Sequence, residues 1–310
     1  MISTKNKIII TFIITICIGF FVLTKSQSKE PVKVTENTEE ESTSKSVFEK
    51  ILSSSKKDVP EINNYYSLTL VTEKPFDELA QYVDGADLEN TLKLNRINSE
   101  FLKQGDTLVL SYDIKDFLYL SPFPKELSIS KEIPKLLLIS QKVQAFGVYE
   151  YGDLVRWGPV SSGKELTPTE SYLYFTNWKA KEAVSTFDDE WIMKWNFNLD
   201  NLKGIGMHQY EMPGYPASHS CVRMFEEDAK WLYDWADQWI VSRDEQRVLA
   251  SGTPVIIFGY YDYDQTAPWK NLPVSQDATK IDLETLNNTV SFYKEKIIKE
   301  MEKRNSLLKN

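Results

Sequence analysis

The residue types best suited to covalent chemistry lie in one short segment, residues 206–235. It holds both histidines of the chain, His208 and His219, and one of the two cysteines, Cys221, while Cys17 lies in an apolar stretch near the N-terminus. A cysteine reacts as the thiolate, and its free pKa is about 8.5, so it needs a base or a positive neighbour. Imidazole can take the thiol proton and later return it to a leaving amine. The grouping predicts catalysis by a nucleophilic thiol.

The loop between the two reactive residues also fits this chemistry. Pro213, Gly214 and Pro216 predict a constrained turn that brings His208 back toward Cys221. A helix expected to begin near residue 226 would hold the far end of the segment in place.

Other interpretations of the same residues remain open. A lone cysteine is often a small buried apolar residue, and a lone histidine is often structural. A single-metal site made of His208, His219 and Cys221 has few ligands and poor spacing. We therefore expect no metal and no cofactor. Arg223 adds fixed positive charge beside Cys221.

Composition limits the function classes. The 310 residues carry a formal net charge of −9, which argues against nucleic-acid binding through a general basic field. With one thiol outside the N-terminal segment, the chain has no intramolecular disulfide framework. A chain of this length forms one large domain or two ordinary ones.

The N-terminus resembles a targeting segment. Lys5 and Lys7 precede an apolar run from Ile8 to Leu23, and Lys25 ends it. Residues 1–25 are therefore expected to be a signal peptide or an uncleaved membrane anchor, and either one exports the chain. Residues 26–60 are rich in Ser, Thr, Lys and Glu and predict a flexible tether. Contact with a membrane is expected only through the N-terminal segment.

Two folded regions are expected to follow the tether. Residues 61–113 read as strand, helix, helix and strand, and with "LKLNRI" and "LKQGDTLVL" they resemble a degenerate LysM module. That resemblance implies binding to peptidoglycan or chitin glycan, and the alternative is a small packing domain without a ligand. Residues 134–262 contain short aromatic and β-branched strands broken by Gly, Pro and Ser.

Helices are expected at two places after the reactive segment. "AKWLYDWADQWI" predicts one helix with a shared apolar face, formed by Leu232, Trp235, Ala236, Trp239 and Ile240. Residues 263–310 predict a polar connection and then a Lys- and Glu-rich helix from about 283 to 308, either a surface helix or a frayed tail.

Four ordered segments resemble the L,D-transpeptidase catalytic domain. "GIGMHQYEMPGYPASHSCVRM" is similar to that family's signature, in which a first His and a loop precede Ser-His-Gly-Cys, an apolar residue, Arg or Asn, and another apolar residue. "VSSGKELTPTES", "DAKWLYDW" and "GTPVIIF" match three further family segments in the same order. The resemblance implies a mainly β catalytic domain, a β-sandwich with few helices, beside the small α+β module.

The family's residue roles are implied for the matching positions. Cys221 is implied to be the nucleophile and His208 the proton donor and acceptor. His219 belongs to the Ser-His-x-Cys turn with Ser218 and is expected to position it. Arg223 is implied either to orient a substrate carboxylate or to pair with Glu226, Glu227 or Asp228. Backbone N–H groups near Cys221 are expected to form the oxyanion hole.

The chain departs from the family pattern in three ways. Ser220 stands where the family has Gly, and if that position needs a positive φ the serine costs about 1 kcal/mol or more. Glu170 replaces the Gly of the Thr-Pro-Thr-Gly segment. The loop from His208 to Cys221 is shorter than in many members. None of the departures removes a reacting group.

The sequence thus predicts an exported cell-wall enzyme of the periplasm or cell envelope. It would attack peptidoglycan stem peptides through a thioester, release D-alanine and form cross-links. Two alternatives remain. One is a hydrolase on the same scaffold, an L,D-carboxypeptidase or a cross-link-cleaving enzyme. The other is a non-catalytic peptidoglycan-binding protein.

Overall fold

The structure, a computed structural model, describes residues 64–112, 114, 116–184 and 192–309. The predicted signal or anchor segment, 1–25, and the predicted tether, 26–60, lie outside these residues. Within them, no helix has both the length and the apolar character needed to span a membrane.

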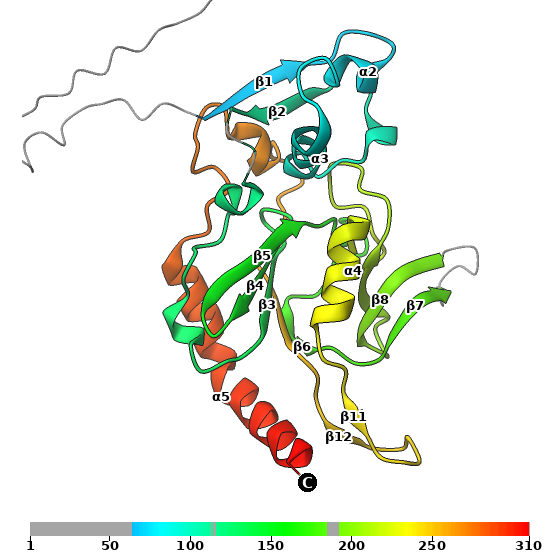
Figure 1. Cartoon of the computed structure of the whole chain (residues 1–310), viewed down its shortest axis with the longest axis vertical. Helices are drawn as coiled ribbons and strands as arrows, with labels where there is room; N and C mark the ends of the chain where they lie inside the picture. Colours follow the sequence, from blue (N-terminus) through cyan, green and yellow to red (C-terminus); the bar gives the residue numbers. More distant parts are fainter. Residues whose placement is uncertain (1–63, 113, 115, 185–191, 310) are drawn as a thin grey trace, which may run out of the picture. The chain divides into compact units, whose positions relative to one another are not determined.

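The chain order of elements alternates short strands with few helices (Figure 1). The first part holds β1 (Tyr65–Thr69), α2 (Pro75–Leu79), α3 (Gly85–Leu94) and β2 (Thr107–Ser111). The larger part holds β3 (Leu136–Ser140), β4 (Ala145–Glu150), β5 (Asp153–Pro159), β6 (Tyr172–Phe175), β7 (Lys179–Val184), β8 (Ile192–Asp200), β9 (Ile205–Gln209), β10 (Val222–Met224), α4 (Glu226–Trp235), β11 (Ile240–Val241), β12 (Val248–Ala250), β13 (Pro254–Phe258) and α5 (Leu283–Leu308).

A five-stranded sheet, ordered β5-β4-β3-β13-β6, forms the centre of the larger part. Its strand β3 is buried along its whole length, and its side chains alternate between two cores as the two-residue period of a strand requires. Leu136 and Leu138 join the core beneath α5, whereas Leu137 and Ile139 join the core that faces the second sheet.

The second sheet, ordered β10-β9-β8-β7, packs its inner face against that second core. Phe197 from β8, Met207 from β9 and Val222 from β10 meet Leu137 of the first sheet there, and Leu232 of α4 closes the core. The prediction of a mainly β catalytic domain with few helices is confirmed.

The predicted helix through Ile240 is too long. Helix α4 ends at Trp235, and the next residue, Ala236, is extended with ψ 146°. Asp237 explains the end, since its N–H donates to Thr253 Oγ1 at 2.9 Å and its carbonyl accepts from Thr176 Oγ1 at 2.6 Å. These bonds to neighbouring segments take the place of further helical bonds, and Ile240 lies in β11.

Residues 64–111 form the expected strand–helix–helix–strand unit. Strands β1 and β2 pair antiparallel, with Leu68 opposite Leu108. Leu70, Leu79 and Leu110 fill a small core of their own beneath α2 and α3. This arrangement agrees with the predicted order of elements, and the glycan-binding role implied by the LysM resemblance stays a prediction.

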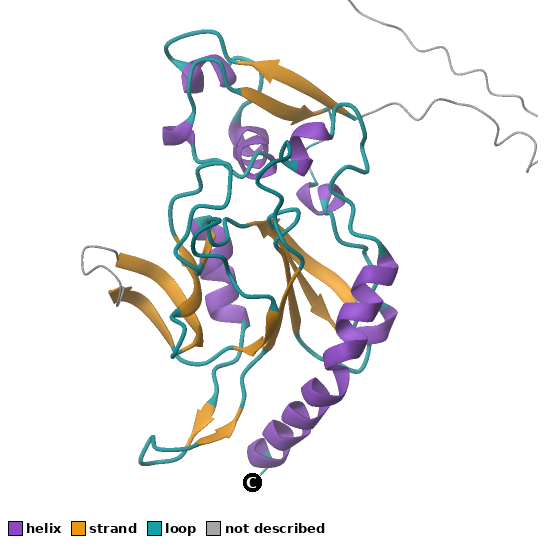
Figure 2. Cartoon of the chain, turned by 180° about the vertical axis from the view of Figure 1, so that it is seen from behind, coloured by secondary structure: helices purple, strands orange, loops and turns teal. Residues whose placement is uncertain are grey.

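Helix α5 has the predicted bounds but is not a frayed tail. Asp282 caps its first turn by accepting from the Thr285 N–H at 2.8 Å. One side of the helix buries Leu286, Val290 and Ile297 in the core that contains Leu136. Figure 2 shows α5 running along the five-stranded sheet. The helix therefore completes the fold of the catalytic part.

The packing of α5 predicts that replacement of leucine by alanine destabilises the protein at a buried position of the helix but not at an exposed one. Leu286→Ala is expected to lower the free energy of unfolding by about 3 kcal/mol, since its side chain is fully buried. Leu308→Ala, at a side chain that is 66% exposed, is expected to change it by less than about 0.5 kcal/mol. Urea unfolding of both variants checks this, and equal losses would show that the helix does not pack as described.

Candidate active site

The parallel pairing of β9 with β10 brings the two reactive segments together. His208 lies opposite Arg223 in this register, and Cys221 immediately precedes β10. The chain between them leaves one strand and returns to start its neighbour alongside it. The loop therefore makes the return that Pro213 and Gly214 predicted.

One cavity of about 490 Å³ lies over these strands. All six site residues predicted from the sequence contribute to its lining: His208, Ser218, His219, Ser220, Cys221 and Arg223. Side chains of β8 and of the turn before β9 complete it, among them Asn196, Asn198, Asn201 and Lys203. The charged residues of this lining are cationic, since it includes Lys203 and Arg223 and no Asp or Glu among the described residues.

The geometry of His208 sets which ring nitrogen can act as a base. The side chain is 5% exposed, and Nδ1 lies 2.9 Å from the carbonyl oxygen of Gln209. A carbonyl only accepts, so Nδ1–H donates to it and Nε2 keeps its lone pair. Burial, more than the nearby Arg223 cation, lowers the pKa of His208 to about 4, although the bond to Gln209 opposes the shift. The imidazole is therefore neutral near pH 7.

Cys221 rests as a thiol. Its Sγ–H donates to the carbonyl oxygen of Gly204 at 3.3 Å. Burial raises the pKa of the thiol, while the Gly206 backbone N–H and the charge of Arg223 partly offset that rise. The thiolate forms in this environment when a base removes the proton, and the neutral imidazole of His208 faces the same cavity.

The segment after β5 holds the Ser218–Cys221 turn in place. Ser218 N–H donates to Ser162 O at 3.0 Å, and Ser218 O accepts from Lys164 N–H at 2.9 Å. Further along, Thr169 Oγ1 donates to Ser220 O at 2.9 Å. The Ser-x-Gly-Lys and Thr-Pro-Thr residues of the sequence thus act as a support for the turn that carries Cys221.

Gly163 lies in this segment at the point where its backbone runs close to that of residues 167–169. A Cβ atom at that position would be 2.2 Å from the carbonyl oxygen of Thr167, so only glycine fits there. The next residue, Lys164, places its Nζ 2.9 Å from His219 Nε2. An ammonium only donates, so Nε2 accepts, and burial followed by the Lys164 charge lowers the pKa of His219. These contacts agree with a positioning role for His219.

Ser220 has the strained backbone that its place in the signature suggested. Its φ is +99°, in the left-handed region that favours glycine. Its φ and ψ set the direction of the peptide group that joins it to Cys221, including the Cys221 N–H. The strain therefore lies next to Cys221.

Arg223 does not form the ion pair that was one of its two predicted roles. Its guanidinium lies over the ring of Tyr210, 4.6 Å from the centroid, and Nη1 donates to the carbonyl of Glu211 at 3.3 Å. The acidic residues at the start of α4 bond elsewhere, since Arg156 Nη2 lies 2.9 Å from Glu227 Oε1 and 2.6 Å from Asp228 Oδ1. Arg223 is thus available at the cavity for an anionic group.

Sequence reasoning missed the turn before β9. The carbonyl of Gly204 in this turn accepts a hydrogen bond from the Cys221 thiol. Every residue has a backbone carbonyl, so the sequence does not reveal such a contact. Lys203 lines the cavity and pairs with Glu170, the residue that stands in place of the family's Gly. In the described residues, no group of three or more His, Cys, Asp and Glu side chains is placed to hold a metal ion.

Comparison with known proteins agrees with the family resemblance. Residues 134–257 match the family model described as the L,D-transpeptidase catalytic domain, which confirms that resemblance for this part of the chain. No curated protein matches the chain.

Similar solved structures include three bacterial L,D-transpeptidases. The protein from Stackebrandtia nassauensis is 22% identical over 41% of this chain and 57% of its own, with a TM-score of 0.34. The protein from Mycobacterium smegmatis is 20% identical over 41% and 59%, with a TM-score of 0.33. One from Mycobacterium tuberculosis H37Rv is 18% identical over 41% and 58%, with a TM-score of 0.32. The matched part spans less than two thirds of each of these proteins.

The strain at Ser220 predicts that glycine stabilises the fold. Ser220→Gly is expected to raise the free energy of unfolding by up to about 1 kcal/mol, because relief of the positive φ exceeds the extra freedom of glycine in the unfolded chain. Ser220→Ala keeps the Cβ atom and should give no gain. Urea unfolding of both variants decides, and a gain with alanine would assign the effect to the hydroxyl instead.

The neutral His208 predicts a loss of stability in mild acid. The unfolded chain takes up a proton at this residue near its ordinary pKa of 6.5, whereas the folded chain does so near pH 4. Between these values the unfolded state binds more protons, so the free energy of unfolding falls as pH falls. At pH 4.5 the loss from this residue is roughly 2 to 3 kcal/mol relative to pH 7.5.

His208→Asn removes the titrating group and is the matched variant. Urea unfolding at pH 7.5 and pH 4.5 should show that the variant loses roughly 2 to 3 kcal/mol less than the parent chain over this range. Equal losses would mean that His208 is not held neutral in the folded state.

Proposed function

We propose that this chain is an L,D-transpeptidase, a cell-wall enzyme that acts on peptidoglycan stem peptides through a thioester at Cys221. Two facts support the proposal. Residues 134–257 match the catalytic-domain model of that family. The observation that carries it is that the Cys221 thiol and the His208 imidazole, with Nδ1–H donated to Gln209, line one cavity.

The first half-reaction would transfer an acyl group to sulfur. Cys221 Sγ attacks the carbonyl carbon at the L-centre of the third stem residue, and the thiol proton passes to Nε2 of His208. The tetrahedral intermediate then collapses, the bond to D-alanine breaks, and the imidazolium gives its proton to the leaving amine. The product is a thioester at Cys221 with neutral His208 restored.

The second half-reaction would regenerate the thiol. An amine of a second stem attacks the thioester carbonyl, His208 takes the amine proton, and the carbon–sulfur bond breaks as the new amide forms. The sulfur is reprotonated by His208. Negative charge develops on the carbonyl oxygen in both steps, and we assign its stabilisation to backbone N–H groups beside Cys221, whose direction depends on the backbone at Ser220.

The cationic lining of the cavity suits this substrate. Stem peptides carry carboxylates, and Arg223 offers a planar pair of N–H donors that matches a carboxylate. Lys203 adds a second positive charge, although part of it is offset by Glu170. We propose that Arg223 orients a carboxylate of the stem while Cys221 attacks.

Placement of the enzyme would follow from the N-terminal residues. A signal or anchor in residues 1–25 would export the chain to the periplasm or cell envelope, where peptidoglycan lies. Residues 61–113, if they bind glycan as a LysM module does, would raise the local concentration of stems at the active site.

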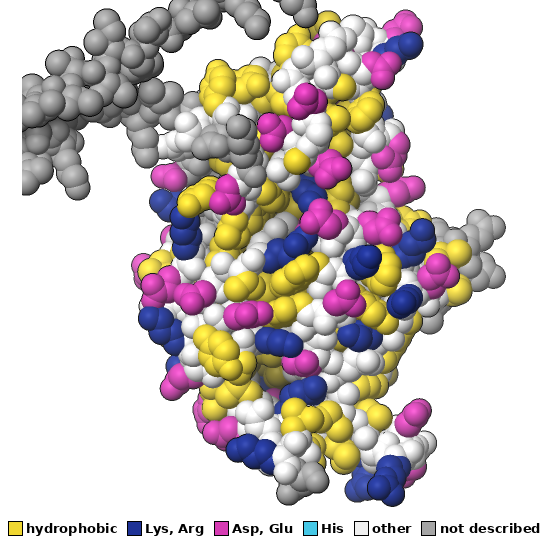
Figure 3. Space-filling view, in the orientation of Figure 1, with side chains coloured by type: hydrophobic (Ala, Val, Ile, Leu, Met, Phe, Trp, Pro, Cys, Tyr) yellow, Lys and Arg dark blue, Asp and Glu magenta, His cyan; other side chains and the backbone are white. Residues whose placement is uncertain are grey.

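No nucleic-acid partner is proposed, and Figure 3 shows acidic and basic side chains interspersed on the face it presents.

Water in place of the amine would make the same site a hydrolase. The thioester chemistry would be unchanged, and the product would be a tripeptide rather than a cross-link. A non-catalytic wall-binding protein is the other alternative, and it would tolerate replacement of Cys221.

Mass spectrometry with a disaccharide-tetrapeptide muropeptide separates these functions. The full chain is used for this test. We expect loss of D-alanine together with a new dimeric muropeptide, and neither product with Cys221→Ala.

The other outcomes each contradict part of the proposal. D-Alanine release that leaves only tripeptide would identify a hydrolase. An unchanged muropeptide, with no acyl adduct on Cys221 in the intact-mass spectrum, would contradict enzymatic action on this stem. Activity that persists in Cys221→Ala would exclude Cys221 as the nucleophile.

A further inference from the structure

The turn after α3 contacts the loop that joins the two reactive segments. Asn98 N–H donates to Met212 O at 2.7 Å, and Met212 N–H donates back to Asn98 Oδ1 at 2.7 Å. Close by, Gly214 N–H donates to Arg96 O at 2.9 Å, and Ile97 pairs with Pro213 as a β-bridge. Residues 96–98, which precede the catalytic domain in sequence, thus form part of the support of its active-site loop.

Arg96 fixes this turn to the catalytic domain. The residue has φ +58° and is 1% exposed. Its Nη2 donates to Val143 O at 3.1 Å, and the guanidinium lies 4.5 Å from the ring centroid of Trp269. Burial lowers the pKa of Arg96 to about 9. Nη1 donates to the carbonyl of Leu94, and no ion pair of Arg96 with an acidic side chain is seen in the described part of the chain. Burial of a charge with such partners is costly, so these contacts define the position of the turn closely.

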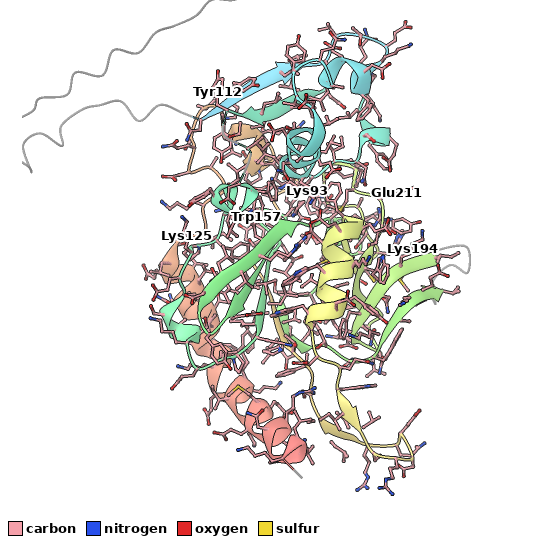
Figure 4. All side chains as sticks on the ribbon, viewed as in Figure 1. Lys93, Tyr112, Lys125, Trp157, Lys194 and Glu211 are labelled. Atoms are coloured by element: carbon pink, nitrogen blue, oxygen red, sulfur yellow. The ribbon has the colours of Figure 1, made fainter. Side chains whose placement is uncertain are left out.

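The supported loop in turn holds Arg223. The Tyr210 ring lies against the guanidinium, and the Glu211 carbonyl accepts from Nη1. Met212, whose backbone is bonded to Asn98, follows directly and is fully buried. In Figure 4, Glu211 is labelled in this loop and Lys93 on α3. Movement of Met212 would therefore displace the carbonyl and ring that orient Arg223.

We infer that Asn98 is a positioning residue of the active site, which holds the loop Tyr210–Gly214 and through it keeps the Arg223 guanidinium at the Cys221 cavity. Its consequence for catalysis rests on the proposed function, in which Arg223 binds a substrate carboxylate. The inference also gives residues 64–111 a task that does not depend on glycan binding, since one of their turns completes the site.

The charge near Cys221 can be measured without any stem peptide. Iodoacetate is an anion and iodoacetamide is neutral, so the ratio of their alkylation rates at Cys221 reports the positive charge that Arg223 supplies. The rates are read in the full chain from the mass of the peptide that contains Cys221, which keeps Cys17 out of the signal. Arg223→Ala sets the ratio expected without the guanidinium.

Asn98→Ala is expected to lower this ratio about threefold, toward the value of Arg223→Ala. The matched control is Asn95→Ala, the same substitution three residues away. Asn95 donates to Thr91 O and Val109 O and accepts from Val109 N–H, all within residues 64–111. It should lower the melting temperature and leave the ratio unchanged. Asn98→Leu, which keeps the branching of the side chain at Cγ and removes the acceptor, replaces Asn98→Ala if that variant does not fold.

Two results would overturn the inference. One is an Asn98 variant that is folded and has the parent ratio. The other is an equal fall in ratio for Asn95→Ala, which would show a general loss of packing rather than a specific contact.

Kinetics with the tetrapeptide muropeptide separate this inference from the proposed function. If both hold, Asn98→Ala raises KM about fivefold and changes kcat by less than about twofold. If the parent chain does not process the stem but the alkylation ratio falls in Asn98→Ala, the proposed function fails and the positioning role stands. If the stem is processed and neither the ratio nor KM changes, the positioning role fails alone.

Discussion

The parallel register of β9 and β10 is the constraint on which the site depends. Parallel neighbours cannot be joined by a tight turn, so the chain must leave the end of β9 and return to the start of β10. The returning residues have no long helix or strand of their own to fix them. Their backbone groups must therefore find hydrogen-bond partners in other segments of the chain. These partners come from the segment after β5 on one side and from the turn after α3 on the other.

Burial controls the protonation of both reacting groups. It raises the pKa of Cys221 and lowers that of His208, so the two shifts oppose formation of a thiolate–imidazolium pair at rest. The resting pair is therefore neutral, and proton transfer must be favoured by charges that arrive with a substrate or develop during attack. The Arg223 charge and the Gly206 N–H already offset part of the cost on the sulfur.

Elements with strong local signals could be predicted from the sequence. Asp282 at the N-cap and the apolar spacing after it indicate α5, and the alternating cores on either side of β3 follow from an apolar run too short for a helix. The end of α4 could not be predicted, because bonds from Asp237 to two distant threonines outweigh the helical pattern that continues to Ile240. Local pattern and long-range hydrogen bonding compete there, and only the first is visible in the sequence.

In the candidate site, too, some features could be predicted from the sequence and others could not. The choice of Cys221 and His208 follows from residue types and from the family signature. The signature also marks position 220 as one where serine replaces glycine, and the structure gives this residue a positive φ. The contacts of Arg223 could not be predicted, because the nearby acidic residues suggested an ion pair. Arg156 already pairs with two of those residues, Glu227 and Asp228. Gly204 and Met212 act through backbone groups, which every residue possesses. Contacts of that kind become visible only when the strands that carry them are placed side by side.

Ser220 bears on whether the site has decayed. A strained residue persists when its surroundings over-determine its conformation. Here the carbonyls on either side of His219 are both held, that of Ser218 by Lys164 N–H and that of Ser220 by Thr169 Oγ1. Both Cys221 and His208 are present, and the turn that holds Ser220 keeps these hydrogen bonds. The strain at Ser220 therefore lies within a turn that its neighbours hold in place, and strain of this kind is compatible with a working site.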